Sequence, residues 1–401
     1  MSASGLSVSG VADLRDRLQE HVESGSLPGA VALVGRGDEV HVEVVGRQSL
    51  GGAPMRRDSI FRIASLTKPI AALGALILVD DGVVRLDDPV DDVLPELADR
   101  RVLRRVDSPL DDTVAAVRPI TLRHLLSFQM GFGAVMVAPG TYPIQEAEEA
   151  LGLRTLGPPW PPPPFGPDEW IRRFATLPLL HQPGDGWMYN TGAQVLGILI
   201  ERASGRSLEQ FLGDRVFGPL GMTDTGFSVP VDRRDRFTTA YAPDPTSGAL
   251  VVLDDARDSW WAEPPAMPNA AGWLVSTIDD LWAFVRVVLA GGVHRGEQIV
   301  SAERLAEMTT DQTSPEQRAS AALFLGDDGG WGLGLRVPAG GRRAESTADG
   351  IGWDGGTGTA WRSDPARGTT AILLTQRAMT SPEPPEVFDA FWRAVEPAVS
   401  G

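Results

Sequence analysis

The order of the predicted elements indicates an α/β protein in which a mainly helical lobe is inserted into a lobe built around a sheet. β-rich segments occur near the start of the chain and return from about residue 270, whereas helices joined by long loops fill the middle. The two ends of the chain are therefore expected to share a single sheet. The predicted α/β lobe comprises residues 1–84 and 261–401, and the predicted inserted helical lobe comprises residues 85–260.

The first part of the chain alternates between helical and strand patterns. Apolar residues at helical spacing predict an amphipathic helix over residues 11–22. Two β-rich runs, residues 30–34 and 40–45, flank a Gly-Arg-Gly-Asp sequence and predict a hairpin. A strand-like segment at residues 61–64 then leads toward a helix at residues 70–79, which is apolar on nearly every side. Such a helix is expected to be buried.

The middle part contains one long segment, residues 131–166, that is rich in proline and glycine and includes a proline run at residues 158–164. Neither regular helix nor a central strand is expected there. A long loop of this kind is typical of a lid or pocket rim, and a surface excursion is the alternative. Around it the sequence predicts four helices, at residues 121–128, 170–175, 195–203 and 208–217.

The last part of the chain regains β character. A helix is predicted at residues 279–290, and a second helix at residues 385–395 closes the chain. Three strands lie between them and would join the N-terminal hairpin in the shared sheet. They are predicted at residues 331–337, 357–362 and 369–375.

Charge and composition argue against several functional classes. The 401 residues carry a formal net charge of −17, whereas nucleic acids and anionic membranes require a basic patch. The absence of cysteine removes thiolate catalysis, disulfides and cysteine-ligated zinc. No secretory signal is visible, and no apolar stretch reaches the roughly 20 residues that span a bilayer. We therefore expect a soluble cytoplasmic protein that acts on a small molecule without a metal or cofactor.

One lysine stands alone among the basic residues. The chain contains 36 Lys plus Arg, yet Lys68 is its only lysine. Wherever a positive charge is merely needed on the surface, this sequence uses arginine. A lone lysine indicates a task that guanidinium cannot perform, and proton transfer is the obvious one, because an ammonium can lose its proton in a folded site. The alternative is that a biased composition left one lysine by chance.

Ser65 and Lys68 form a Ser-x-x-Lys sequence where the strand-like segment gives way to the buried helix. Residues i and i+3 lie on one helix face with about 5–6 Å between their Cβ atoms, so the hydroxyl and the amine can meet. A serine at a helix start also gains from the positive end of the helix dipole. Such tetrapeptides occur by chance in many proteins, so this one is a weak signal by itself.

Other systems for nucleophilic catalysis are less well supported. The chain has no G-x-S-x-G sequence and no H-E-x-x-H sequence. Its five histidines lie outside Gly-rich and metal-ligand spacings, and we interpret them as surface or packing residues. If a serine is the nucleophile, its base must therefore be another residue type. The histidines are His21, His41, His124, His181 and His294.

Two further stretches contain groups that could serve such a serine. Tyr189 is one of three tyrosines and lies in a turn that leads into a helix. Beside a lysine ammonium its phenolate would be favoured, so its pKa is expected to fall. The Gly-rich residues 350–359 open a strand, and two backbone N–H groups there could form an oxyanion hole. The alternatives are a tyrosine that only packs its ring and a glycine bulge.

Taken together, these stretches resemble the serine β-lactamase and penicillin-binding-protein superfamily, and most closely its class C-like branch, which includes the family VIII carboxylesterases. The likeness covers most of the chain from about Leu27 onward. It implies a β-lactamase-like α/β (α+β) fold, with an antiparallel sheet flanked by helices and an inserted helical lobe. The segments that carry it are FRIASLTKP at residues 61–69, residues 86–95 and 121–126, Pro183-Gly184, PLGMTDTGF at residues 219–227, and residues 274–280.

The resemblance also implies roles for particular residues. Ser65 would be acylated, Lys68 would help to deprotonate it, and Tyr189 would be the partner general acid and base. The backbone amides of Ser65 and Gly356 would form the oxyanion hole, and water would hydrolyse the acyl-enzyme. Whether Lys68 or Tyr189 holds the proton at each step is a question of coupled titration that the sequence leaves open.

The tyrosine motif departs from the family pattern. Class C β-lactamases carry Tyr-x-Asn, whereas here Asn190 directly follows Tyr189 and Thr191 occupies the next position. The spacing from Tyr189 to Gly197 resembles the esterase branch instead. An alignment anchored on Asn190 would place Met188 at the tyrosine position.

The third motif departs as well. It normally reads Lys-Thr-Gly or His-x-Gly, and its basic residue helps to bind the substrate carboxylate. Here it reads Trp353-Asp354-Gly355. An aromatic and an acid would be poor partners for a carboxylate and suit a neutral ester better. The residues expected to contact substrate, besides the oxyanion-hole amides of Ser65 and Gly356, are Trp353, Asp354, Gly355 and Asn190.

The sequence therefore predicts a serine hydrolase that works through an acyl-enzyme, and a carboxylesterase acting on small neutral esters is the favoured form. A β-lactamase or D-alanyl-D-alanine peptidase-like amide hydrolase is the first alternative, against which the missing export signal and the altered third motif both weigh. A transferase or amidase with the same acyl-enzyme, and a non-catalytic binding homologue, are further alternatives. The natural substrate and the oligomeric state are not indicated by the sequence.

Overall fold

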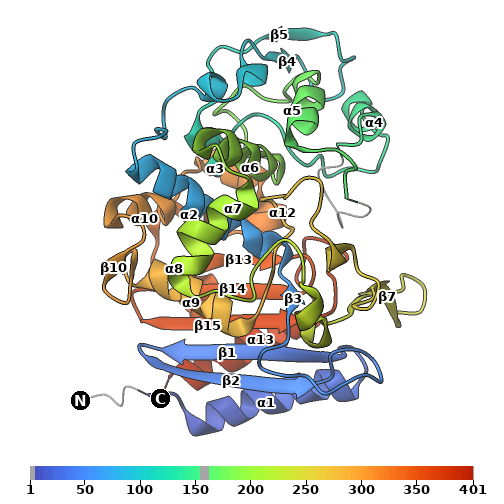
Figure 1. Ribbon diagram of the computed structural model, residues 1–401, viewed down its shortest axis with the longest axis vertical. Coiled ribbons are helices and arrows are strands. Elements are labelled where there is room, and N and C mark those ends of the chain that lie inside the picture. The colour runs from blue at the N-terminus through green and yellow to red at the C-terminus, as the bar shows by residue number, and fades with distance from the viewer. Residues whose placement is uncertain (1–4, 154–161, 401) are drawn as a thin grey trace.

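A seven-stranded antiparallel sheet forms the base of the molecule (Figure 1). The structure is a computed structural model that describes residues 5–153 and 162–400. In the order β11-β12-β13-β14-β15-β1-β2, strands from both ends of the chain lie side by side, and Ala30 of β1 pairs with Thr375 of β15. The strands are β1 Gly29–Arg36, β2 Glu39–Gly46, β11 Gly329–Trp331, β12 Arg336–Pro338, β13 Ile351–Gly355, β14 Thr359–Asp364 and β15 Thr369–Thr375.

The two faces of the sheet pack against different helices because successive side chains of a strand point to opposite faces. On one face, Ala30 and Ala32 of β1 join a core with α1 (Val8–Glu23) and α13 (Glu386–Val399). Figure 1 shows α13 behind the sheet and α1 along its border. On the other face, Val31 joins the main core, which continues without a break into the helical region.

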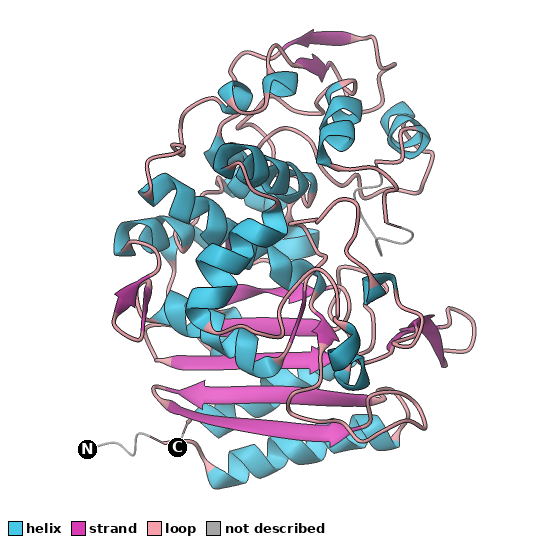
Figure 2. Cartoon of the chain, in the orientation of Figure 1, coloured by secondary structure: helices cyan, strands magenta, loops and turns pink. Residues whose placement is uncertain are grey.

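Helix α2 (Thr67–Asp80) runs through the centre of the molecule and is buried from Thr67 to Leu78. It packs against α6 (Thr191–Ser204), and Figure 2 shows the helices that surround the pair above the sheet. The remaining helices are α3 Leu122–Leu126, α4 Pro143–Ala150, α5 Pro167–Ala175, α7 Leu208–Leu212, α8 Gly218–Leu220, α9 Ile278–Leu289, α10 Ala302–Met308, α11 Pro315–Ser320, α12 Ala322–Leu325 and a π-helix at Gly213–Phe217. Short 3₁₀ turns occupy Ala64–Leu66 (η1), Val90–Asp92, Pro95–Leu97, Val231–Arg236, Trp260–Ala262, Ala339–Gly341 and Thr347–Asp349.

Four two-stranded ribbons complete the described structure. One of them concerns the site directly, because it pairs Phe61 with Ser276 and so fixes the segment that precedes Ser65. The ribbons are β3 (Phe61–Arg62) with β8 (Val275–Ser276), β4 (Arg101–Leu103) with β5 (Thr113–Ala115), β6 (Ala240–Pro243) with β7 (Leu250–Asp254), and β9 (Val293–His294) with β10 (Glu297–Gln298).

Most of the elements predicted from the sequence are present, but the single strand expected at residues 331–337 is wrong. That stretch forms the hairpin of β11 and β12, with its turn between the two strands. Gly334 in this turn has a φ of +89°, which favours glycine, and a Cβ at Gly332 would lie 2.1 Å from the carbonyl oxygen of Met308. The turn therefore requires glycine at these positions, and the β-rich pattern of residues 331–337 did not indicate the turn.

The segment at residues 131–166 also differs from the prediction, because it contains the helix α4. Pro143 stands at the first position of this helix, where its missing N–H costs nothing. Most of the proline run at residues 158–164 lies outside the described residues.

The predicted division into lobes at residues 84/85 and 260/261 stays a prediction. The main core joins Val31 of the sheet to Leu199 of α6 in one cluster, so burial marks no boundary there. Within the described part of the chain, no helix has both the length and the hydrophobicity required to cross a bilayer.

Candidate active site

Ser65 lies on a constrained turn between β3 and α2. The preceding Ala64 adopts a φ of 42°, a left-handed conformation that a residue with a Cβ rarely takes. Two hydrogen bonds hold the turn: the Thr67 hydroxyl donates to the carbonyl oxygen of Ala64 at 2.6 Å, and the amide of Leu274 donates to that hydroxyl at 3.1 Å. Backbone strain of this kind persists only where the surroundings impose it, and it is concentrated at functional sites.

The amine of Lys68 lies 2.8 Å from the hydroxyl oxygen of Ser65. It also donates to the carbonyl oxygen of Ala271 at 2.6 Å. The side chain is 1% exposed, and no carboxylate of the described residues forms an ion pair with it. Burial therefore holds the pKa of Lys68 well below its usual 10.5, since the charged form loses its hydration. A neutral amine beside Ser65 can accept the proton of the serine hydroxyl.

Tyr189 brings a second proton-carrying group to the same serine. Its hydroxyl donates to the Ser65 Oγ at 2.9 Å and accepts a hydrogen bond from the Trp353 indole at 2.8 Å. The Lys68 Nζ lies 4.5 Å from the centre of the Tyr189 ring. The structure thus places Tyr189, rather than the neighbouring Met188, at the serine.

The expected fall in the pKa of Tyr189 is wrong. Burial raises this pKa, and the hydrogen bonds that Tyr189 makes with Ser65 and Trp353 only partly oppose the effect. The physical reason lies in Lys68. Because the buried lysine favours its neutral form, it does not supply the positive charge that would stabilise a phenolate. Burial thus shifts both groups toward their neutral forms, an amine and a protonated phenol.

The hairpin of β13 and β14 lies directly on the nucleophile segment. Gly355 is required by that contact, because a Cβ would lie 2.4 Å from the carbonyl oxygen of Ile63. The Thr357 hydroxyl donates to the carbonyl oxygen of Arg62 at 2.5 Å. The amide of Gly358 donates to the carbonyl oxygen of Gly355 at 2.9 Å, so the trans peptide turns the Gly356 N–H the opposite way.

The predicted contact between Asp354 and substrate stays a prediction, and the structure shows another partner for this side chain. The Asp354 carboxylate forms two hydrogen bonds of 2.8 Å with the guanidinium of Arg362, which also lies over the Trp392 ring of α13. Alternation along the strand explains this position, since Trp353 and Asp354 are consecutive and point to opposite faces of the sheet. Trp353 faces Tyr189, and the acid of the motif faces the helix on the other side.

Asn190 adopts a φ of 83° and stands at the N-cap position of α6. Asparagine tolerates this conformation better than most residues. The residue thus turns the chain directly after Tyr189, and its predicted contact with substrate stays a prediction. The predicted contact of Trp353 with substrate stays a prediction too, and its indole donates a hydrogen bond to Tyr189. The carbonyl oxygen of Ala271 carried no sequence signal, because a backbone acceptor depends on the path of the chain.

The histidines are apart from this site, as the sequence indicates. His124 completes the N-terminal cap of α3 by accepting a hydrogen bond from the Thr121 amide, and His41 contacts Glu43 on β2. In the described residues no histidine forms a hydrogen bond with Ser65. The basic side chain in hydrogen-bond contact with Ser65 is therefore Lys68.

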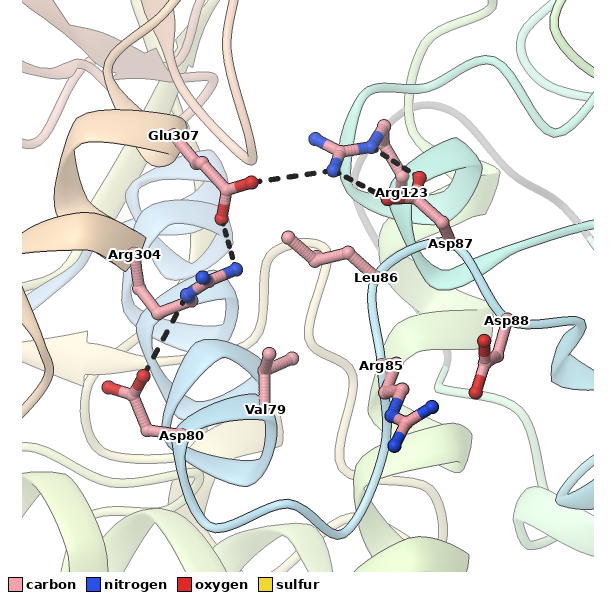
Figure 3. Close-up of a pocket in the computed structure, with 9 residues that line it drawn as sticks. All are labelled: Val79, Asp80, Arg85, Leu86, Asp87, Asp88, Arg123, Arg304 and Glu307. Atoms are coloured by element: carbon pink, nitrogen blue, oxygen red, sulfur yellow. Dashed lines mark hydrogen bonds and ion pairs between the residues drawn. The ribbon is translucent and has the colours of Figure 1, made fainter.

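A pocket of about 400 Å³ lies at the far end of α2 (Figure 3). Asp80 lines it at the C-terminal end of the helix, whereas Lys68 is near the N-terminal end. At 1.5 Å per residue, the helix separates them by about 18 Å. Charged groups in the pocket contact one another, since Arg304 contacts Asp80 and Glu307, and Arg123 also contacts Glu307. This pocket is separate from the Ser65 site.

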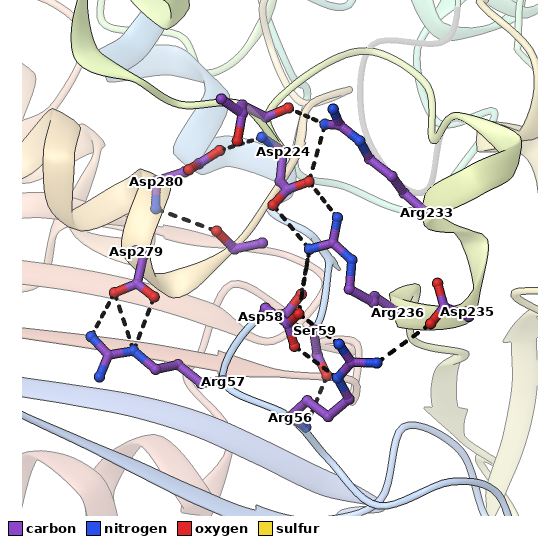
Figure 4. A network of polar contacts seen from close by, with 12 residues as sticks. Arg56, Arg57, Asp58, Ser59, Asp224, Arg233, Asp235, Arg236, Asp279 and Asp280 are labelled. Carbon is purple, nitrogen blue, oxygen red and sulfur yellow. Dashed lines mark hydrogen bonds and ion pairs between the residues drawn. The ribbon is translucent and has the colours of Figure 1, made fainter.

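A network of ion pairs supports the chain just before β3 (Figure 4). Asp224 accepts hydrogen bonds from Arg233 and Arg236, and Arg236 donates to the carbonyl oxygen of Asp58 at 3.1 Å. The amide of Arg56 is bound by the hydroxyl of Ser59 at 3.0 Å. These contacts fasten the strand that leads to Ser65 onto the segment around residues 224–236.

Comparisons with known proteins identify a family and several relatives, one of which is named as an esterase. A family model described as Beta-lactamase matches residues 14–394. Protein Rv1367c of Mycobacterium tuberculosis is 36% identical over 373 residues, which cover 90% of this chain and 88% of that protein. Esterase EstB of Burkholderia gladioli is 32% identical over 378 residues, which cover 88% of this chain and 86% of the esterase.

Among solved structures, that of EstCE1, described as a hydrolase with promiscuous acyltransferase activity, matches with a TM-score of 0.76. The two chains are 24% identical, and the match covers 96% of this chain and 98% of the other. This likeness confirms the predicted fold class, an antiparallel sheet with flanking helices and a helical region.

Proposed function

The chain belongs to the Beta-lactamase family, as the resemblance implied, and we propose that it is a serine hydrolase that forms an acyl-enzyme on Ser65 and acts on small neutral esters. One observation carries the proposal. The Ser65 Oγ lies 2.8 Å from a buried lysine amine, which has no carboxylate partner among the described residues, and 2.9 Å from a tyrosine hydroxyl. This arrangement supplies a base and an acid at one nucleophile.

In the proposed reaction, the neutral amine of Lys68 takes the proton of the Ser65 hydroxyl while Oγ attacks the ester carbonyl carbon. The carbonyl oxygen becomes an oxyanion, for which the amides of Ser65 and Gly356 are the proposed donors. In the described residues neither amide donates a hydrogen bond within the protein. Both are therefore available to a ligand.

The tetrahedral intermediate then releases the alcohol. Tyr189 gives its proton to the leaving oxygen, and the proton held on Lys68 restores the phenol, so that the pair gains one proton and gives one away. Water next attacks the acyl carbon and loses a proton to the same pair, and Ser65 is regenerated with the carboxylic acid as product. Because the two groups are coupled, their pKa values belong to the pair.

Preference for a neutral ester rests on the groups around Ser65. Trp353 occupies the position where a basic residue would bind a substrate carboxylate, and its indole is engaged by Tyr189. Arg362 is the nearest arginine along the hairpin, but it is bound to Asp354 on the other face. Among the described residues, Lys68 is therefore the only basic side chain that contacts Ser65, and burial favours its neutral form. The relative named as an esterase supports the same substrate class.

The test is covalent labelling with a fluorophosphonate probe, followed by intact mass and peptide mapping. We expect one adduct on Ser65, its loss in Ser65→Ala, and normal labelling in the exposed control Ser381→Ala. No adduct would favour the alternative of a non-catalytic binding homologue. Parallel rates on p-nitrophenyl butyrate and nitrocefin then separate an esterase from a β-lactamase, and faster turnover of nitrocefin would contradict the proposed substrate class.

A further inference from the structure

The ring of Tyr189 lies in a layer of aromatic side chains. Four of its ring neighbours are buried, whereas the fifth, Phe324, is only partly buried and is the ring of this layer that reaches solvent. Phe324 belongs to α12, a helix of four residues that ends at Gly326, whose φ is +69°. The four buried neighbours are Phe128, Trp187, Trp331 and Trp353.

Phe324 covers one face of the catalytic candidate Tyr189. The two rings are stacked, with their centres 4.6 Å apart and 28° between their planes. The Lys68 Nζ lies 4.5 Å from the same ring centre. Two groups this close to one ring centre are best accommodated on opposite faces, which puts the amine over the face away from Phe324. Tyr189 is thus held between Lys68 on one side and Phe324 on the other.

The space behind this cover is apolar. Trp187 contacts both Tyr189 and Phe324, with ring centres 6.0 Å and 5.8 Å away. Its indole N–H is buried and has no acceptor among the described residues. On this side of Tyr189 no acceptor of the described protein reaches the Trp187 N–H, and Phe324 is the one ring of the layer that is partly exposed.

We propose that Phe324 is a positioning residue of the Ser65 site, an aromatic cover that keeps water from the face of Tyr189 opposite Lys68. The inference rests on the proposed function, in which Tyr189 protonates the leaving alcohol. With the cover in place, a phenolate would have no hydration on that face, so the phenol keeps its proton until the leaving oxygen needs it. Removal of the cover admits water and lets the phenol ionise at lower pH.

Among the described residues, Lys68 faces Tyr189 directly and Asp354 acts on it from the other face of the sheet, and neither belongs to α12. Lys68 approaches from α2, and Asp354 on β13 acts through its charge while bound to Arg362. Two groups form hydrogen bonds with the Tyr189 oxygen: the hydroxyl of Ser65 in η1 and the indole of Trp353 in β13. A substitution at Phe324 leaves all of these in place and changes only the cover.

The experiment compares pH profiles of kcat/KM for p-nitrophenyl butyrate. Wild type should keep its activity from pH 8 to pH 10, because burial keeps Tyr189 protonated there. In Phe324→Ala, Tyr189 should approach an ordinary tyrosine pKa of about 10, so kcat/KM at pH 10 should fall to about half of its value at pH 8. Phe324→Gln fills the same space but attracts water, and its kcat/KM at pH 10 should decrease in the same way. This variant replaces Phe324→Ala if the alanine protein is not stably folded.

Two controls separate this effect from general loosening. Phe324→Leu retains an apolar cover and should keep the wild-type profile. Leu323→Ala removes a side chain that is 48% exposed on the same helix and should leave the profile unchanged. The proposal is overturned if the alanine or glutamine variant follows the wild-type profile, or if Leu323→Ala shifts it equally. A wild-type protein that neither labels at Ser65 nor turns over the ester would instead contradict the proposed function.

Discussion

Two buried basic side chains close to the nucleophile, Arg62 and Lys68, have opposite surroundings. Arg62 is 2% exposed and forms an ion pair with Asp254, and it also donates to the carbonyl oxygen of Thr238 and the hydroxyl of Ser259. Lys68 is 1% exposed and has no carboxylate partner among the described residues. Because the two side chains are almost equally buried, the difference in their behaviour comes from the carboxylate partner that only Arg62 has among the described residues.

The pKa values follow from this difference. Burial lowers the pKa of Arg62 to about 10, with Asp254 opposing the effect, so this guanidinium stays charged at neutral pH. Burial lowers the pKa of Lys68 with no carboxylate to oppose it. The arginine therefore acts as a structural cation between Phe237 and Trp261, whereas the lysine is available as a base. A buried structural cation and a buried candidate base thus lie six residues apart in the same chain segment.

The most severe way to break this contrast is Lys68→Arg, which keeps a basic side chain but removes one that can lose its proton. We expect kcat for p-nitrophenyl butyrate to fall by ~10³-fold or more, as for loss of a catalytic base. The reverse exchange, Arg57→Lys at an exposed pair with Asp279, is the matched control and should leave kcat unchanged. A Lys68→Arg enzyme within tenfold of wild type would refute the assignment of Lys68 as base.

The contribution of the Arg62–Asp254 pair is tested by measuring the free energy of unfolding. Asp254→Ala leaves the Arg62 charge buried without its partner, so we expect the free energy of unfolding to fall by about 3–5 kcal/mol. Asp279→Ala breaks an exposed pair of the same kind and should cost less than about 1 kcal/mol. Urea denaturation of both variants gives the values. Equal losses would mean that burial of the Arg62 pair has no special weight.

A smaller effect is expected where Trp353 holds the Tyr189 hydroxyl. Trp353→Phe keeps an aromatic ring and removes the N–H donor, so Tyr189 loses one of its two hydrogen bonds. A loss of about 1–1.5 kcal/mol corresponds to roughly a tenfold fall in kcat with little change in KM. Trp361→Phe on the neighbouring strand removes a similar hydrogen bond, to Ser363, and should leave kcat near wild type. An equal fall in both variants would indicate a general packing effect.

The smallest expected change concerns the stability cost of Lys68 itself. The unfolded chain carries a hydrated ammonium at pH 7, whereas the folded site favours the neutral amine. Lys68→Met should therefore raise the free energy of unfolding by about 1 kcal/mol while removing activity, since burial of a polar group is relieved. Between the folded and the unfolded pKa of Lys68 the unfolded chain binds more protons, so wild-type stability rises with pH. The advantage of the variant should narrow from pH 7 to pH 9.5, and a constant difference would contradict a depressed pKa.

Sequence reasoning predicted those parts of the molecule that local patterns encode. The buried helix α2 follows from residues 70–79, and the Ser-x-x-Lys spacing places Lys68 one helical turn from Ser65. Contacts between segments that are distant along the chain could not be predicted from local patterns. The carbonyl oxygen of Ala271 that holds Lys68 lies 203 residues away along the chain, and only the folded path brings it there.

What the sequence did not show had similar physical causes. Asp354 was expected to contact substrate because it belongs to the third motif, and the pattern did not show that strand alternation turns its carboxylate to Arg362 on the other face of the sheet. The pKa of Tyr189 was expected to fall because the sequence shows a lysine charge but not its burial. Phe324 carried no signal, because its importance comes from stacking on a ring more than a hundred residues away.

The most direct test of the central claim, that Lys68 is a neutral base at Ser65, is the pH dependence of the rate at which a fluorophosphonate labels this serine. Labelling needs only the deprotonation and attack of Ser65, so product release does not enter. A lysine with a depressed pKa predicts that the rate rises with pH and reaches a plateau well below pH 10.5. A rate that still rises tenfold per pH unit through pH 10 would contradict it.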